Sequence, residues 1–142
     1  MSWSYEDALA NEREPTKALS ENECWSRLEE AEYGRVVTSA AGQIDIFTVN
    51  HRPDGRTILF RTAAGTKLVE LTIHSDVIFQ IDGKDDDEAF SVVVKGRAEE
   101  LQTSRETEAA EHSGVHPWAP EEKDRWVRIT PREVTGRSFH LA

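Results

Sequence analysis

Hydrophobic residues first recur at helical spacing and then at strand spacing along the chain. Ser20 and Glu23 have the spacing of a capping box, so a helix is predicted to begin after Ser20. We expect Gly34 to end this helix, because glycine readily adopts the left-handed conformation. The residues that would form its apolar face are Cys24, Trp25, Leu28 and Ala31.

Short runs rich in β-branched and aromatic residues follow the helix, separated by turn residues. Alternation of Ile44 and Ile46 with Phe47 and Val49 predicts a strand buried on much of both faces. Gly96 predicts a bulge or bend in a long strand. The predicted strands are residues 35–39, 44–49, 57–61, 77–81, 90–101, 126–129 and 134–140, with Pro131 separating the last two.

The succession of strands joined by tight turns favours an antiparallel barrel over a doubly wound sheet. We predict a mainly β protein, a six- to seven-stranded antiparallel split β-barrel with a few short α-helices. Two further helices are expected at residues 65–72 and 103–111, the second opened by Thr103 and Glu106. Residues 1–18 are predicted to be an N-terminal arm, and residues 19–142 a single domain.

Composition limits which ligands the protein could bind and where in the cell it is expected. The formal net charge of −10 argues against non-specific binding to nucleic acid, which needs clustered Lys and Arg. Cys24 is the only cysteine, so an intrachain disulfide is excluded. His112 and His116 are four residues apart, but Gly114 and Pro117 interrupt a helix there, and we expect no metal site. No signal peptide or membrane span is recognised, so a cytoplasmic protein without membrane contact is expected.

Several phosphate-binding groups converge in residues 61–67. Arg61 ends a predicted strand, Thr62 and Thr66 carry hydroxyls, Gly65 permits close backbone approach, and Lys67 adds charge. The first turn of the following helix would direct unpaired N–H groups to the same anion. The glycine spacing differs from that of a nucleoside-triphosphate P-loop.

Solvated charge is the alternative interpretation of the same segment. Arg61 and Lys67 would then form ion pairs with Glu70 or Asp76 and bind no ligand. Residue types alone leave both interpretations open.

Neighbouring segments favour the phosphate site through a family resemblance. The sequence FRTAAGTKL at 60–68, followed by VVVKGRA at 92–98, is the most specific pair. With the further segments 19–25, 34–36, 45–50, 128–131 and 135–137, the chain resembles the pyridoxamine-phosphate-oxidase-like, flavin-binding split-barrel superfamily. More narrowly, it is similar to the small actinobacterial-type flavoproteins of that group over residues 19–139.

The resemblance implies a homodimer with two flavin mononucleotide (FMN) sites at the subunit interface. Carried over by position, the cofactor-binding residues would be Arg61, Thr62, Gly65, Thr66 and Lys67 at the phosphate, Val49, Asn50 and His51 along the ring, largely through their backbone, and Ser91 and Trp118 as weaker assignments. The protein is expected to be an oxidoreductase that passes electrons or hydride to a small acceptor. The alternatives are a deazaflavin-dependent reductase and a flavin-binding module without turnover.

Two departures from the family pattern affect the ring environment. The family commonly has proline where Thr48 stands and an aromatic residue where His51 stands. His51 is either a proton donor near the flavin or, as the simpler interpretation, a surface histidine at a hairpin end. True pyridoxamine 5'-phosphate oxidase is disfavoured, because the chain is short and a second phosphate site is not recognised. No catalytic residue is identified.

Overall fold

The computed structural model describes residues 16–63, 65, 68, 70–71, 74–115 and 125–141. Thr66, Lys67, His116 and Trp118 lie outside this part. The helices are α2 (Glu21–Glu30) and α4 (Ser104–Glu111), and Leu68, Glu70 and Leu71 also have helical backbone. None of the described helices combines the length and apolarity needed to cross a membrane. The strands are β1 (Thr16–Ala18), β2 (Tyr33–Ala40), β3 (Gln43–Asp54), β4 (Thr57–Thr62), β5 (Asp76–Lys84), β6 (Glu88–Glu100) and β7 (Arg125–His140).

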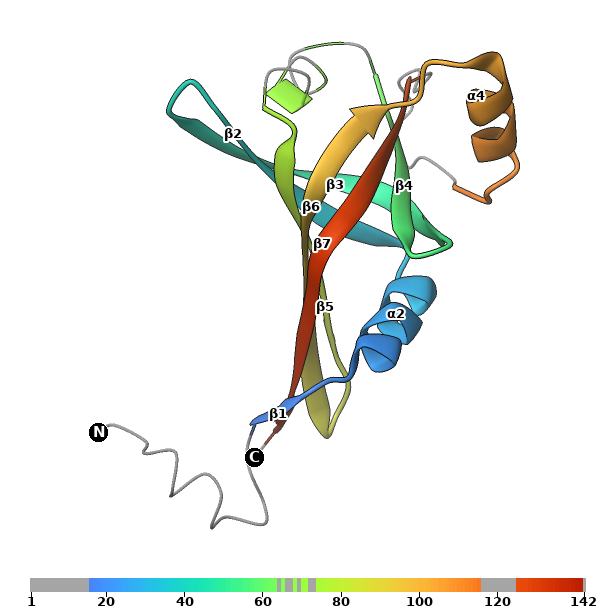
Figure 1. Ribbon diagram of the computed structural model, residues 1–142. Coiled ribbons are helices and arrows are strands. Elements are labelled where there is room, and N and C mark those ends of the chain that lie inside the picture. The colour runs from blue at the N-terminus through green and yellow to red at the C-terminus, as the bar shows by residue number, and fades with distance from the viewer. Residues whose placement is uncertain are drawn as a thin grey trace.

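Six of these seven antiparallel strands close into a barrel. The sheet order is β1-β7-β4-β3-β2-β5-β6, and β6 pairs again with β7, which completes the ring. Strand β1 pairs with the end of β7 outside that ring, so the last residues of the expected N-terminal arm form a strand. Figure 1 shows β7 extending along the barrel and the β2–β3 hairpin projecting from one side. The predicted fold class, a mainly antiparallel split β-barrel, is confirmed.

The strand that closes the barrel is longer than the sequence predicted. Residues on both sides of Pro131 belong to one strand, β7, so the prediction of two separate strands was wrong. Pro131 lies opposite Gly96, and the β6–β7 register shifts between Lys95 and Gly96. The bulge expected at Gly96 is therefore present. It lets the ladder pass a proline that has no N–H to donate.

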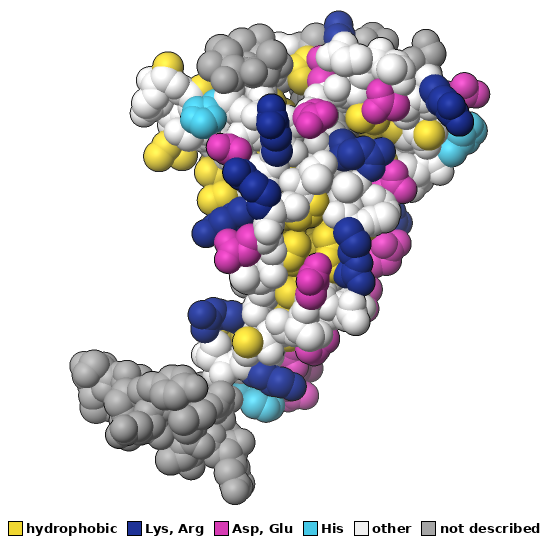
Figure 2. Space-filling view, viewed as in Figure 1, with side chains coloured by type: hydrophobic (Ala, Val, Ile, Leu, Met, Phe, Trp, Pro, Cys, Tyr) yellow, Lys and Arg dark blue, Asp and Glu magenta, His cyan; other side chains and the backbone are white. Residues whose placement is uncertain are grey.

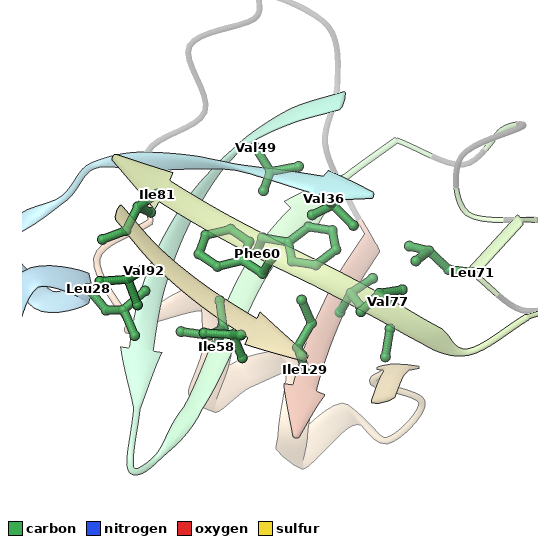
Figure 3. Close-up of a cluster of buried hydrophobic side chains, with 14 of the residues drawn as sticks. Leu28, Val36, Val49, Ile58, Phe60, Leu71, Val77, Ile81, Val92 and Ile129 are labelled. Carbon is green, nitrogen blue, oxygen red and sulfur yellow. The ribbon is translucent and has the colours of Figure 1, made fainter. Parts of the chain in front are cut away.

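The barrel interior is filled by side chains that alternate along the strands. On β4, Ile58 and Phe60 point inward, whereas Leu59 belongs to a second cluster with Trp126 outside the barrel. Phe60 is fully buried and lies centrally among the side chains drawn in Figure 3. Complete burial of such a side chain contributes about 1.5–3 kcal/mol, so β4 is held firmly in place.

Strand β3 is buried on one face, not on two. Phe47 and Val49 lie in the core, but the side chains of Ile44 and Ile46 are 73% and 63% exposed. These isoleucines lie on the part of the hairpin that projects from the barrel (Figure 1), so the core does not reach them. The prediction of burial on both faces was wrong for that reason.

Helix α2 begins where the sequence predicted and ends earlier. Ser20 and Glu23 form the reciprocal capping box. The helix ends at Ala31 in an extended conformation, and Gly34 is part of β2, so the predicted glycine cap was wrong. Gly34 instead makes room for the Phe79 ring, because a Cβ there would overlap it.

His51 fastens α2 to the barrel. Its side chain is 2% exposed, its Nε2 lies 3.0 Å from the Leu28 carbonyl oxygen, and its ring meets Phe79 edge to face at 4.8 Å. The interpretation of His51 as a surface residue was wrong. Burial lowers the pKa of His51 from 6.5 to about 4, although the hydrogen bond to Leu28 acts in the opposite direction. His51 is therefore neutral near pH 7.

Replacement of Gly96 by valine should destabilise the barrel. A Cβ at this position would overlap the Thr130 carbonyl oxygen and lie 2.9 Å from Cα of Pro131. We expect Gly96→Val to lower the free energy of unfolding by about 1–3 kcal/mol, measured by urea denaturation. Lys95→Ala is the control on the same strand, because Lys95 is exposed, and it should change that free energy by less than about 0.5 kcal/mol. Equal stability of Gly96→Val and the wild type would contradict the tight bulge.

The free energy of unfolding should decrease as the pH is lowered, because His51 becomes protonated when the chain unfolds. Its folded-state pKa, about 4, lies below the ordinary value of 6.5, so the unfolded chain binds more protons between these values. The stabilisation is complete above about pH 6.5 and is lost as the pH falls towards 4, by up to about 3 kcal/mol. Urea denaturation from pH 7.5 to 4 should show this component in the wild type and not in His51→Gln. Identical pH dependence of the two proteins would disprove the assignment.

Candidate functional site

Arg61 projects from the outside of the barrel near the end of β4. Because Phe60 points into the core, its neighbour Arg61 faces the opposite way. The register places Arg61 directly opposite Trp126 on β7. The guanidinium carbon lies 4.8 Å from the centre of the Trp126 ring, and Nη2 lies 3.4 Å from Oε1 of Glu111. The sequence placed Arg61 at this strand end correctly.

The guanidinium of Arg61 carries an unused donor. Its Nε is buried and has no hydrogen-bond partner among the described residues. Nη2 faces Glu111 at 3.4 Å, longer than an ordinary charged hydrogen bond of about 2.7–2.9 Å. A buried polar group without a partner costs about 1–3 kcal/mol. The Nε–Nη2 edge is therefore suited to an anion with two oxygens, such as phosphate.

Glu111 and Trp126 both contact Arg61, and the sequence did not predict either contact. Trp126 Nε1 donates a hydrogen bond of 3.1 Å to the Glu111 oxygen that faces Arg61. Glu111 is the last residue of α4, and β7 brings Trp126 beside β4. One signal was available in the sequence, because a carboxylate in the last helical turn is unfavourable unless something compensates for it.

Thr62 is buried and Gly65 is exposed, so the two predicted phosphate ligands differ in their access to an anion. The Thr62 side chain is 4% exposed and points to the barrel interior, and its hydroxyl donates a long bond of 3.4 Å to the Ala63 carbonyl. Gly65 is exposed, and a Cβ there would lie within 4 Å of none of the described residues. The described residues therefore leave the Gly65 backbone accessible to an anion. Thr66 and Lys67, the other predicted phosphate ligands, lie outside the described residues.

The three predicted ring-lining residues of β3 alternate between the two faces. Val49 and His51 point inward and are buried. Asn50 faces outward, and because His51 lies opposite Phe60, Asn50 is on the same face as Arg61. The His51 side chain is thus separated from the Arg61 face by the sheet. Its location in the core removes the basis for an exposed proton donor.

Ser91, by contrast, is far from Arg61 within one chain. Ser91 on β6 pairs with Arg137 of β7, whereas Arg61 pairs with Trp126 of the same strand. Arg137 and Trp126 are eleven residues apart. At about 3.3 Å per residue, the separation along the strand is roughly 35 Å. Ser91 Oγ accepts a bond of 3.4 Å from Gln80. A site that combines Arg61 with Ser91 would need a second copy of the chain. Trp118 lies outside the described residues.

Arg61 pairs with an acidic residue, as the solvated-charge interpretation expects, but that residue is Glu111 and not Glu70 or Asp76. Lys67 lies outside the described residues. Glu70 accepts a hydrogen bond of 3.0 Å from Thr38, and Asp76 pairs with Arg132. Arg61 instead faces Glu111. Within the described part of the chain, no group of three or more His, Cys, Asp or Glu side chains could hold a metal.

Known proteins match this chain over most of its length. An uncharacterized protein of Mycobacterium tuberculosis is 42% identical over 87 residues, which cover 61% of this chain and 79% of that protein. A Corynebacterium glutamicum structure, provisionally named a pyridoxamine 5'-phosphate oxidase, is 40% identical with a TM-score of 0.84, covering 90% of this chain and 96% of that one. An FAD binding protein from Mycobacterium smegmatis is 35% identical with a TM-score of 0.75, covering 87% of this chain and 98% of that one.

A family model agrees with these similarities. The model described as pyridoxamine 5'-phosphate oxidase matches residues 20–138, which include β2 to β6, all but the last two residues of β7, and Arg61. The chain therefore belongs to the pyridoxamine 5'-phosphate oxidase-like family.

Proposed function

We propose that this protein is a flavoprotein that binds FMN and holds its phosphate at Arg61. The observation that supports this most directly is the buried Nε of Arg61, which has no partner among the described residues. A phosphate would accept from Nε and Nη2 together and so satisfy that donor. None of the described residues crowds Gly65, three residues beyond the end of β4, which supports an anion beside the strand end.

The comparisons support a flavin more broadly than they support FMN. A relative that is 35% identical is named as an FAD binding protein. FMN and FAD share the ring, and they differ in whether the phosphate is terminal or continues into an adenosine diphosphate. A terminal phosphate carries nearly two negative charges near pH 7, against one on each phosphate of FAD, so a charge-assisted contact with Arg61 favours FMN. FAD and a deazaflavin coenzyme are therefore the competing ligands in the binding test.

A homodimer is the second part of the proposal. Ile44 and Ile46 are exposed on the β2–β3 hairpin, and Val37 lies directly opposite both Ile46 and Ile78. These four residues define an apolar hairpin patch, and Figure 2 shows hydrophobic side chains at the projecting hairpin on the upper left. A contiguous apolar surface of this kind is typical of a protein interface. A second copy would also bring its own Ser91 to the interface.

Bound flavin would supply the redox chemistry, a transfer of electrons or hydride to a small acceptor. The chain would bind the phosphate, orient the ring beside Asn50 and limit access of water. The neutral, buried His51 does not act as an acid here. Oxidation of reduced nicotinamide nucleotides by the flavin-loaded protein distinguishes an oxidoreductase from a binding module that does not turn over.

Loss of the Arg61 charge should weaken FMN binding selectively. Arg61→Gln removes a charge-assisted contact to phosphate, so the Kd for FMN should rise about 30-fold, or about 2 kcal/mol. Riboflavin lacks the phosphate, and its Kd should change less than about threefold. Flavin fluorescence titration measures both ligands, and FAD and a deazaflavin coenzyme are titrated alongside.

Arg56→Gln is the matched control, because Arg56 is exposed beside the other end of β4. It should leave the Kd for FMN unchanged. A wild-type protein that takes up no flavin would disprove the proposed function. If FMN binds equally well to Arg61→Gln, the phosphate lies elsewhere.

Charge placed on the hairpin patch should separate the subunits. Ile44→Lys combined with Ile46→Lys replaces two exposed isoleucines, each worth about 1.5–3 kcal/mol when buried. We expect the dimer Kd to rise at least about 100-fold in sedimentation equilibrium. Leu141→Lys, at an exposed leucine outside the patch, should have no such effect. A monomeric wild type would refute the dimer, and equal dissociation in the control would refute the hairpin patch as its interface.

A further inference from the structure

Glu111 occupies the position beside Arg61 that an anionic ligand would need. Its Oε1 accepts a 3.1 Å hydrogen bond from Trp126 Nε1 and lies 3.4 Å from Arg61 Nη2. The Glu111 side chain is half exposed and the Arg61 side chain is 23% exposed. A carboxylate therefore lies at the open end of the guanidinium while Nε of Arg61 stays without a partner among the described residues.

The location of Glu111 is unfavourable for the helix that carries it. Glu111 is the C-terminal residue of α4, where the helix dipole repels negative charge, and the last turn contains no basic residue. Of the described residues of α4, Ala110 is the one that packs in the cluster around Leu59 and Trp126. The contacts to Arg61 and Trp126 are thus what compensates for a carboxylate at this helix end.

We propose that Glu111 is a built-in counter-ion that a ligand's phosphate displaces from Arg61, and that it thereby sets the affinity of the site for anionic ligands. Glu111 contacts Nη2 with one oxygen beyond hydrogen-bond length, whereas phosphate can accept from both Nε and Nη2. The exchange therefore favours phosphate. A ligand without negative charge gains nothing from displacing Glu111.

Displacement does not require α4 to leave the barrel. Trp126 Nε1 can keep its hydrogen bond to Glu111 when the carboxylate turns away from Arg61. Ala110 remains 2% exposed against its cluster and anchors the helix. The switch is local, and it acts on the charge next to Arg61. This inference rests on the proposed flavin-phosphate site.

Removal of the Glu111 charge tests the inference with FMN and riboflavin as the paired ligands. Glu111→Gln keeps an oxygen acceptor for Trp126 and removes the competing charge. An exposed ion pair is worth up to about 1 kcal/mol, so the Kd for FMN should fall about three- to fivefold. The Kd for riboflavin should not change. Glu108→Gln, at an exposed residue of the same helix, should alter neither value.

A second readout uses inorganic phosphate and no flavin. The indole N–H resonance of Trp126, assigned with Trp126→Phe, should shift when phosphate is added to the wild type at constant ionic strength. Chloride should not reproduce the shift, and Arg61→Gln should abolish it. The same Glu111 oxygen contacts Trp126 Nε1 and Arg61 Nη2, so the shift reports the altered geometry of the retained Trp126–Glu111 hydrogen bond when Glu111 turns away from Arg61.

The outcomes separate this inference from the proposed function. If the wild type binds FMN and Arg61→Gln weakens it, while Glu111→Gln leaves FMN binding unchanged or weaker, the counter-ion role is overturned and the flavin site stands. Equal changes for FMN and riboflavin overturn it too, because they indicate a packing effect. If no flavin binds, the proposed function fails, and the phosphate-dependent resonance decides: without a shift, the counter-ion role fails as well.

Discussion

The pairing of β7 with two neighbours at once is the constraint on which the rest of the structure depends. Strand β7 pairs with β6 along nearly its whole length and with β4 through residues 125–129. Closing six strands into a ring requires the sheet to curve, and the register shift between β6 and β7 beside Gly96 contributes to that curvature. The same closure places Trp126 opposite Arg61. The candidate site exists because the barrel is closed.

Strand β4 then divides its side chains between stability and function. Ile58 and Phe60 are fully buried in the barrel, and Leu59 is buried in the outer cluster. Three successive buried side chains, each worth about 1.5–3 kcal/mol, leave the backbone before Arg61 little freedom. A ligand that binds Arg61 therefore meets a guanidinium whose position is fixed in advance, which reduces the entropy lost on binding.

Local features of this chain were readable from the sequence, and features that depend on distant strands were not. The helix caps at Ser20 and Thr103 follow from residues within a few positions of each other. The burial of His51 does not, because it depends on Phe79 from β5 and on α2.

In the candidate site, too, the sequence predicted the local feature and not the contacts with distant residues. Arg61 was identified from its position at a strand end, and its partners were missed. Trp126 reaches Arg61 through barrel closure, and Glu111 does so through the docking of α4. The resemblance to a family suggested residues 61–67 as the phosphate segment, but it carried no information on the contact that Glu111 makes from a separate helix.

The energetics of Arg61 connect the fold to the affinity of the site. A buried donor without a partner, such as Nε, costs the folded chain about 1–3 kcal/mol. Glu111 faces Nη2 and leaves Nε unsatisfied, so the counter-ion reduces the charge without removing that cost. An anion that accepts a hydrogen bond from Nε removes this cost, and the free energy gained adds to the Coulomb attraction between the anion and the guanidinium. In a protein with a net charge of −10, whose overall field repels anions, a pre-positioned donor of this kind gives affinity that long-range electrostatics would not provide.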